Sequence, residues 1–312
     1  MNMSWRGVMP ATTTAFDENL NIDHAFVANH AQWLIDNGCT AIVAPGSLGE
    51  GATLSFDEKV ALWSTLVAAV GERAPVVAAI ASLSTAEAVA LAKRAADAGC
   101  NGLMVLPPYV YRSDWREMKA HVEAVLRATN LSCMLYNNPV AYGTDFLPEQ
   151  IRELAAEHEN LAAVKESSTD VRRITWIKEL TGARLEISVG VDDAIVEGIA
   201  AGAVGWVAGL VNALPRESVA LFNYATNGEH EKARELYHWF LPLLRMDTVP
   251  KFVQLIKLVQ QEVGMGSTRV RPPRLELVGQ ELEEARRVIT SAAARNPLSK
   301  ASSKSATPLS SE

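Results

Sequence analysis

A short apolar run that ends in a lysine and a glutamate is the pattern in this sequence most suited to chemistry. Residues 161–168 read LAAVKESS, so Lys165 ends a predicted buried strand and shares a face with Leu161 and Ala163. Burial disfavours the ammonium form and makes a neutral, nucleophilic amine accessible near neutral pH. Such an amine attacks carbonyl or imine carbons. Lys165 is therefore a candidate nucleophile; the alternative is a solvated lysine just beyond a strand.

A tyrosine ends another predicted strand. Residues 134–139 read MLYNNP, and strand alternation places Tyr136 on the same face as Met134 and Ser132. A phenol with a pKa near about 10 can donate and retrieve a proton without being ionised at rest. Tyr136 is thus a candidate proton relay for a carbinolamine intermediate. The alternative is a tyrosine that packs its ring and hydrogen-bonds a loop.

A glycine-rich loop follows a third predicted strand. Residues 44–51 read APGSLGEG, in which three glycines, including Gly49, let several backbone N–H groups meet at one carboxylate. Ser47 adds a hydroxyl donor. The spacing matches neither a dinucleotide-binding fingerprint nor a Walker loop, so no nucleotide is indicated. The loop is a candidate carboxylate site, with an ordinary turn as the alternative.

The elements that must position these residues are βα units. Short apolar runs alternate with helical patterns, which is typical of a parallel sheet. Gly38, Gly99 and Gly202 each end a predicted helix just before a strand, so one unit is repeated along the chain. The predicted strands are residues 7–12, 40–45, 75–80, 102–107, 131–136, 161–165, 185–190 and 204–208.

Two of the intervening helices have clear start signals. Ser55 with Glu58 and Ser84 with Glu87 both fit a capping box, in which hydroxyl and carboxylate satisfy free backbone donors.

Eight units within about 200 residues predict an α/β fold, a (β/α)8 TIM barrel, in preference to an open doubly wound sheet. We expect residues 1–214 to form the barrel, and residues 215–295 to form its last helix and a C-terminal helical extension. Residues 296–312, rich in Ser, Lys and Pro, are expected to be a disordered tail. In such a barrel the carboxyl ends of all strands share one face, so the three candidate motifs would converge there. The helices predicted after the last strand are residues 216–226, 230–244, 250–263 and 281–294.

Composition narrows the class of partner. The 312 residues are 48% hydrophobic and 21% charged, as in ordinary soluble globular proteins. The net charge of −7 argues against a nucleic-acid binder, so a small molecule is the expected partner. With neither a signal-peptide pattern nor an apolar stretch of membrane-spanning length, we expect a cytoplasmic protein that does not bind membranes.

No cysteine or histidine pattern predicts a metal site. Cys39, Cys100 and Cys133 stand singly, without CxxC spacing, and are interpreted as small buried hydrophobic residues. His230 is followed by EKAR, so the HExxH zinc motif is not present there.

Together, GSLGE at 46–50, YNNP at 136–139 and VKE at 164–166 resemble the dihydrodipicolinate synthase and N-acetylneuraminate lyase family of class I Schiff-base aldolases. The resemblance covers about residues 5–294 and includes GVDD at 190–193. It implies that Lys165 forms a Schiff base with a 2-oxo acid and that Tyr136 relays protons. It further implies a homo-oligomer, commonly a tetramer, with no cofactor and no metal.

The same resemblance assigns substrate-binding residues. The hydroxyl of Ser47 and the amides of Ser47 and Leu48, in the loop that contains Gly49, are expected to hold the substrate carboxylate. Val207, on the eighth predicted strand, matches a position whose backbone helps to hold the substrate near the lysine.

Residues that differ from those of the lysine-pathway synthase help to indicate which member of the family this protein resembles most. The synthase has an arginine where this chain has Ala141, and relay hydroxyls at the positions of Leu48 and Val110. These losses argue against the synthase, although Tyr109 or Tyr111 could supply a hydroxyl from a shifted loop.

Three longer strings look like one branch of the family, the 1-pyrroline-4-hydroxy-2-carboxylate deaminases of hydroxyproline breakdown. They are YNNPVAYG at 136–143, KESS at 165–168 with RRI at 172–174, and GWVAG at 205–209. The expected activity is a deamination that yields 2-oxoglutarate semialdehyde and ammonia. The apolar Leu48, Val110 and Ala141 suit a small substrate with one carboxylate.

The same residues are compatible with other functions. The same Schiff base would serve 4-hydroxy-tetrahydrodipicolinate synthase, which adds pyruvate to aspartate semialdehyde. It would equally serve an aldolase or dehydratase that acts on a sugar-derived 2-oxo acid. An alternative of another class is a non-catalytic barrel that binds a 2-oxo acid, since fold alone does not establish activity.

Overall fold

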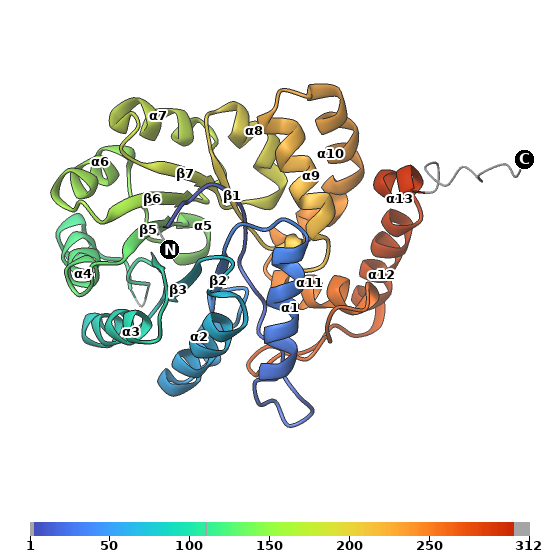
Figure 1. Ribbon diagram of the computed structural model, residues 1–312, viewed down its shortest axis with the longest axis horizontal. Helices are drawn as coiled ribbons and strands as arrows, with labels where there is room; N and C mark the ends of the chain where they lie inside the picture. Colours follow the sequence, from blue (N-terminus) through green and yellow to red (C-terminus); the bar gives the residue numbers. More distant parts are fainter. Residues whose placement is uncertain (1–2, 110, 303–312) are drawn as a thin grey trace, which may run out of the picture.

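Eight parallel strands surrounded by helices form the centre of the protein (Figure 1). The computed structural model describes residues 3–109 and 111–302. The strands are hydrogen-bonded in the order β1-β8-β7-β6-β5-β4-β3-β2. Their bounds are β1 (Gly7–Pro10), β2 (Ile42–Ala44), β3 (Val76–Ile80), β4 (Gly102–Val105), β5 (Ser132–Asn137), β6 (Leu161–Glu166), β7 (Glu186–Val189) and β8 (Gly205–Ala208).

Contacts between the first two strands close this sheet into a barrel. Ala11 and Val43 form a parallel bridge, and the Thr40 amide donates to the Val8 carbonyl at 2.9 Å. The predicted (β/α)8 barrel is confirmed, and the doubly wound alternative is wrong. Each predicted strand is present. Six are shorter than predicted, β5 is shifted by one residue to Ser132–Asn137, and β6 extends one residue further, to Glu166.

Helices follow the strands and cover the outside of the barrel. Gly38 and Gly99, with φ of 93° and 87°, end two of them in the left-handed conformation that glycine adopts without strain. The barrel helices are α1 (His24–Asp36), α2 (Phe56–Val70), α3 (Thr85–Asp97), α4 (Trp115–Arg127), α5 (Pro139–Tyr142), α6 (Pro148–Glu157), α7 (Arg172–Thr181), α8 (Ile195–Ala200) and α9 (Pro215–Thr226).

One predicted capping box is complete and the other is half formed. At α2, Ser55 accepts from the Glu58 amide, and the Glu58 carboxylate accepts from the Ser55 amide. At α3, Ser84 accepts from the Glu87 amide, but the Glu87 carboxylate instead accepts a hydrogen bond from the Ser82 hydroxyl. The competing local partner explains the difference.

The chain after α9 is helical. It contains α10 (His230–Leu244), α11 (Phe252–Glu262), α12 (Gly279–Ala293) and α13 (Pro297–Ser302), gathered on one side of the barrel (Figure 1). A short 3₁₀ turn, η4 (Arg245–Asp247), joins α10 to α11. The division into domains stays a prediction. Helix α13 occupies the start of the expected tail, and residues 303–312 lie outside the described residues, as does Val110.

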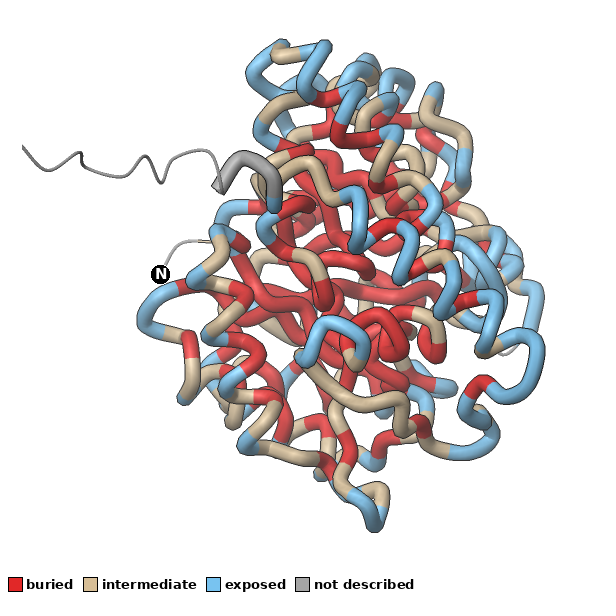
Figure 2. The backbone as a smooth tube through the Cα atoms, turned by 90° about the vertical axis from the view of Figure 1, so that its right-hand side faces the viewer, coloured by how far each residue is buried: buried red, intermediate tan, exposed pale blue. Residues whose placement is uncertain are grey.

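The core has two layers, one between the strands and the helices and one inside the barrel. Buried residues run through the middle of the molecule (Figure 2). Met134 and Tyr136 pack inside the barrel, whereas Cys133 and Leu135 pack outward against helices. This alternation along β5 is the predicted one. All three cysteines are buried and free, as predicted.

One predicted face is wrong. Ala163 packs in the barrel interior, but Leu161 belongs to the outer cluster between strands and helices. The register between β5 and β6 shifts so that Cys133 pairs with Leu161 and Met134 with Ala163. Ala162 is therefore an extra residue that reverses the alternation, as a β-bulge does. Lys165 keeps its predicted place above Ala163.

Among residues 3–109 and 111–302, no helix combines the length and the apolar character needed to cross a membrane.

Candidate active site

Lys165 and Tyr136 lie side by side at the carboxyl end of the barrel. They are register partners on β6 and β5, and the Lys165 Nζ lies 4.2 Å from the centroid of the Tyr136 ring. Their relative exposures are 6% and 5%, so both side chains are withdrawn from water. The strand pairing therefore brings together the two residues that the sequence nominated for chemistry.

A glycine makes room for the lysine. Gly190 directly follows β7, and a methyl group at this position would lie only 2.6 Å from the Lys165 Cε and 2.7 Å from its Cγ. Any larger residue at this position would collide with the stem of the lysine. The glycine of the GVDD string thus lets the lysine side chain cross the end of the neighbouring strand.

Burial changes the protonation of this amine. Desolvation lowers the pKa of Lys165 to about 8, although the nearby carboxyl groups of Asp247 and Asp192 act to raise it. Roughly a tenth of the side chains would be neutral at pH 7. The site thus supplies a neutral amine near physiological pH, as a Schiff-base nucleophile requires.

Asp192 is a fixed acceptor beside the site. Its carboxylate accepts hydrogen bonds from the Trp206 Nε1 at 3.0 Å, the Gly209 amide at 3.1 Å and the Leu210 amide at 2.8 Å. Burial raises the pKa of Asp192 to about 6, and these donors lower it in part. Both carboxyl oxygens are thereby engaged by the end of β8 and the turn after it.

A second tyrosine links Tyr136 to the glycine loop. The hydroxyl of Tyr142, on α5, hydrogen-bonds that of Ser47, and its ring packs edge-on against Tyr136 at 5.7 Å between centroids. Asn138 donates to the Tyr136 hydroxyl at 3.0 Å. Burial raises the pKa of both phenols, so they are protonated and able to donate.

Several backbone N–H groups of the glycine loop are available to donate hydrogen bonds to a ligand. Its turn is folded by hydrogen bonds from the Glu50 amide to the Ser47 carbonyl and from the Gly51 amide to the Gly46 carbonyl, both 3.1 Å. Within the described part of the chain, the amides of Ser47, Leu48 and Gly49 have no acceptor. Free amides of this kind suit an anion.

A buried ion pair anchors Glu50 of the glycine loop to the C-terminal extension. Lys257, on α11, lies 2.6 Å from the Glu50 carboxylate, and the two side chains are 2% and 0% exposed. The Arg271 amide also donates to Glu50, at 2.9 Å. The C-terminal extension therefore fixes the conformation of the loop.

Leu48 and Val207 face different layers. The Leu48 side chain packs in the outer cluster, which leaves its amide as the group that can reach a substrate. Val207 packs inside the barrel with Tyr136 and Ala163. The substrate-binding roles of Ser47, Leu48, Gly49 and Val207 stay predictions.

Sequence reasoning gave no role to Tyr142, Asp192 or Asp247. Tyr142 follows Tyr136 through one helical turn, a spacing that could have suggested it, whereas Asp247 had no sequence signal. Of the two tyrosines considered as substitutes, Tyr109 lies near Tyr142, with ring centroids 5.7 Å apart. Tyr111 is 54% exposed.

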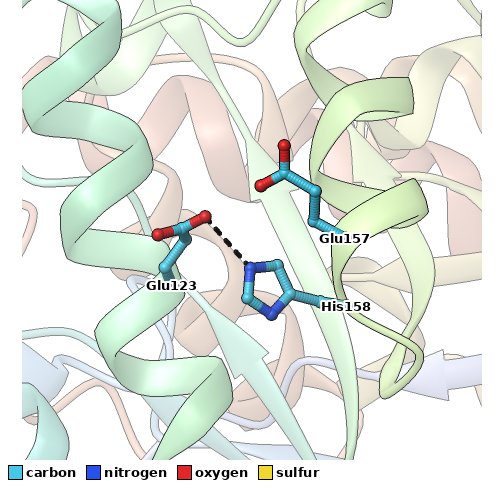
Figure 3. A group of neighbouring side chains, drawn as sticks. All are labelled: Glu123, Glu157 and His158. Carbon is cyan, nitrogen blue, oxygen red and sulfur yellow. Dashed lines mark hydrogen bonds and ion pairs between the residues drawn. The ribbon is translucent and has the colours of Figure 1, made fainter.

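One cluster away from this site has metal-ligand types. Glu123 on α4, Glu157 at the end of α6 and His158 directly after it place ligand atoms within 4.8 Å of one another (Figure 3). Lys119 lies 2.7 Å from Glu157, and Arg127 lies 3.1 Å from Glu123. The carboxylates are thus already paired, and we interpret the cluster as an ion-pair network.

A (β/α)8 barrel with a buried lysine, a neighbouring tyrosine and a loop of free amides defines a class I Schiff-base lyase. The model of the Dihydrodipicolinate synthetase family matches residues 4–292. The chain belongs to this family.

Relatives of known name agree with that assignment. The chain is 34% identical over 287 residues to a 4-hydroxy-tetrahydrodipicolinate synthase of Natronomonas pharaonis, an alignment that covers 92% of this chain and 97% of the relative. It superposes with a TM-score of 0.90 and 27% identity on the 4-hydroxy-tetrahydrodipicolinate synthase of Methylacidiphilum fumariolicum SolV, covering 95% and 97% of the two chains.

A third relative has a ligand in its structure. YagE, a prophage protein of the same family from Escherichia coli K12, was solved in complex with pyruvate. It has a TM-score of 0.87 and 25% identity, covering 93% of this chain and 99% of that one.

Proposed function

We propose that this protein is a deaminase that converts 1-pyrroline-4-hydroxy-2-carboxylate and water into 2-oxoglutarate semialdehyde and ammonia through a Schiff base at Lys165. The observation that carries the proposal is the charge around the amine. The neighbours that shift the pKa of Lys165 through electrostatic interaction are two acids, Asp247 and Asp192.

A substrate with a single carboxylate fits this charge pattern best. The position that holds an arginine in the lysine-pathway synthase is Ala141, an exposed residue of α5. The condensation product of pyruvate and aspartate semialdehyde has two carboxylates, and the second would lie near acids without an arginine partner. The glycine loop accounts for one carboxylate.

The chemistry follows from the intermediate. The neutral Lys165 amine attacks C2 of the cyclic imine, and opening of the ring leaves a protonated Schiff base that acidifies C3. A base, with Tyr136 relaying the proton, removes a hydrogen from C3, and the C4 hydroxyl leaves as water. Tautomerisation moves the unsaturation to the terminal C–N bond. Hydrolysis there and at Lys165 releases ammonia and the semialdehyde.

A second candidate is 4-hydroxy-tetrahydrodipicolinate synthase. The names of the relatives favour it, because the relatives from Natronomonas pharaonis and Methylacidiphilum fumariolicum are both synthases. The Tyr142 hydroxyl also offers a relay group that a synthase would need, close to Ser47 and Tyr136. The missing arginine is the observation against this candidate.

Substrate tests separate the two candidates. Purified protein is incubated with 1-pyrroline-4-hydroxy-2-carboxylate in one reaction, and with pyruvate and aspartate semialdehyde in another, and Lys165→Ala is the control. Release of ammonia and semialdehyde from the first reaction supports the deaminase. Turnover of the second mixture alone would reject it in favour of the synthase, and an adduct with pyruvate without either turnover would favour another aldolase or dehydratase.

We further propose a cytoplasmic homotetramer. The small-molecule chemistry and the family membership support this assembly and location, and α10 to α13 offer surfaces outside the barrel for subunit contacts. Native mass spectrometry and sedimentation would give the subunit count, and a monomer at micromolar concentration would contradict the proposal.

A further inference from the structure

Asp247 reaches the barrel from the C-terminal extension. It is the last residue of η4, between α10 and α11. A methyl group built on Gly209 would lie 2.6 Å from the Asp247 Cγ and 3.0 Å from its Oδ2. The carboxyl group therefore occupies the space that a side chain at position 209, directly after β8, would fill.

The same arrangement occurs at the ends of two neighbouring strands, where the side chain of a distant residue lies over a glycine. Lys165 crosses over Gly190, the residue after β7, and Asp247 lies over Gly209, the residue after β8. β7 lies between β6 and β8 in the barrel. The absence of two side chains thus lets an amine and a carboxyl group approach the same end of the barrel, where their charges interact.

The two acids near Lys165 differ in their hydrogen bonds. Asp192 accepts from three N–H groups, which stabilise its anion. The side chain of Asp247 makes no hydrogen bond or ion pair with any of the residues that the structure describes. Of two nearby carboxyl groups, the one without donors keeps its proton.

The charged surroundings of Asp247 agree with a protonated carboxyl group. Burial and the charges of Asp192 and Asp193 raise its pKa well above the ordinary value, and only Lys165 acts in the other direction. Asp193 itself faces Arg245, 3.7 Å away. Asp247, a carboxyl group without hydrogen-bond donors, is thus the acid of this site best suited to hold a proton and donate it.

We propose that Asp247 is the catalytic acid that protonates the leaving hydroxyl group during the elimination. This inference rests on the proposed deaminase function. Tyr136, on β5, lies on one side of Lys165, and Asp247, above the end of β8, lies on the other. An elimination removes a proton from one carbon and protonates the leaving group on the next; Tyr136 relays the first proton, and Asp247 supplies the second.

The C3–H bond breaks and its proton passes to the base, while its electron pair forms the C3–C4 double bond. The C4–O bond breaks at the same time, and the oxygen takes a proton from the Asp247 carboxyl group and leaves as water. The carboxylate of Asp247 is then reprotonated from solvent. No oxidant or reductant is required.

Two reactions separate this role from a structural one. The first is ammonia release from 1-pyrroline-4-hydroxy-2-carboxylate, which needs loss of the hydroxyl group. The second is exchange of the C3 hydrogens of 1-pyrroline-2-carboxylate with deuterium, followed by NMR, which needs Lys165 and the base but no leaving group. The variants are Asp247→Asn and, as a matched control, Asp193→Asn, which removes the neighbouring acid.

For Asp247→Asn we expect ammonia release to fall about 100-fold and C3 exchange to stay within about threefold of wild type. Asp193→Asn should change neither reaction by more than about threefold. Gly209→Ala provides a second route, because its methyl group would displace the Asp247 carboxyl while keeping the acid. It should likewise slow ammonia release more than exchange.

Equal losses in both reactions would mean that Asp247 acts only through Lys165, and unchanged ammonia release would mean that it has no role; either result overturns the inference. A wild-type protein that exchanges C3 hydrogens but never releases ammonia would instead reject the proposed function. The two failures are thus distinguishable.

Discussion

Lys165 and Tyr136 are register partners on adjacent strands, and the amine of one lies 4.2 Å from the ring centroid of the other. A cation–π contact of this kind stabilises the protonated amine modestly. Burial acts in the opposite direction and has the larger effect, since the pKa of Lys165 lies below its ordinary value. The pair therefore holds the amine close to a proton donor and keeps it reactive.

Replacement of Lys165 by alanine should abolish covalent chemistry. We expect no borohydride-trapped adduct with pyruvate and a fall in turnover of about 10⁴-fold or more, because the amine that forms the Schiff base is removed. Intact mass and peptide mapping measure the adduct. Lys59→Ala is the matched control, since Lys59 is also a buried lysine with a lowered pKa but lies on α2. An adduct retained in Lys165→Ala would contradict the mechanism.

Adduct formation should depend on pH through Lys165. Its pKa is lowered to about 8 and only the neutral amine attacks, so the initial rate should fall about tenfold per unit below pH 8 and level off above it. Quenched-flow trapping with pyruvate between pH 6 and 9.5 measures this profile. In Asp192→Asn the midpoint should move to lower pH, because a negative charge that raises the pKa of Lys165 is removed. A flat profile would show that the amine is not the titrating group.

Tyr136→Phe should separate binding from proton transfer. Removal of the hydroxyl leaves the ring beside Lys165 but removes the proton-relay group, whose oxygen accepts a hydrogen bond from the Asn138 side-chain amide. We expect the pyruvate adduct to form at equilibrium while turnover falls about 10²- to 10⁴-fold. Tyr237→Phe, whose hydroxyl contacts Glu197 on α8, is the control and should keep near-normal turnover. Turnover of Tyr136→Phe within threefold of wild type would exclude the relay.

Ser47 and Tyr142 should act as a coupled pair. Their hydroxyls hydrogen-bond each other, so Ser47→Ala and Tyr142→Phe each remove the same contact. In a double-mutant cycle on kcat/KM we expect the double variant to lose clearly less than the product of the single losses, with a coupling of about 1 kcal/mol. Strictly multiplicative losses would mean that the contact is unimportant in the working enzyme.

The ion pair under the glycine loop should be essential for stability. Lys257→Met leaves the carboxylate of Glu50 buried without its cation, which should lower the free energy of unfolding by about 3–5 kcal/mol. The control is Asp36→Asn, which breaks an exposed pair with Arg73 and should cost less than about 1 kcal/mol. Urea denaturation of the three proteins tests the comparison. Equal effects of the two variants would contradict the buried-pair interpretation.

Much of the fold could be predicted from the sequence. Apolar runs separated by helical patterns and closed by Gly38 and Gly99 indicated the eight βα units, because burial of parallel strands and left-handed helix ends impose local residue types. The positions of Lys165 and Tyr136 followed from strand alternation at the ends of those runs. Alternation failed only where Ala162 inserts an extra residue, which no local pattern marks.

By itself, the sequence determined the barrel and the placement of Lys165 and Tyr136 at the ends of its strands, because strand periodicity and burial are local properties of the chain. Only the tertiary structure decided what completes the site. Closure of the barrel brings Tyr142 to Ser47, 95 positions away, and folding of the extension brings Asp247 over Gly209. Such contacts depend on helix placement and on space left by glycines, which are properties of the packed molecule and not of any short stretch of residues.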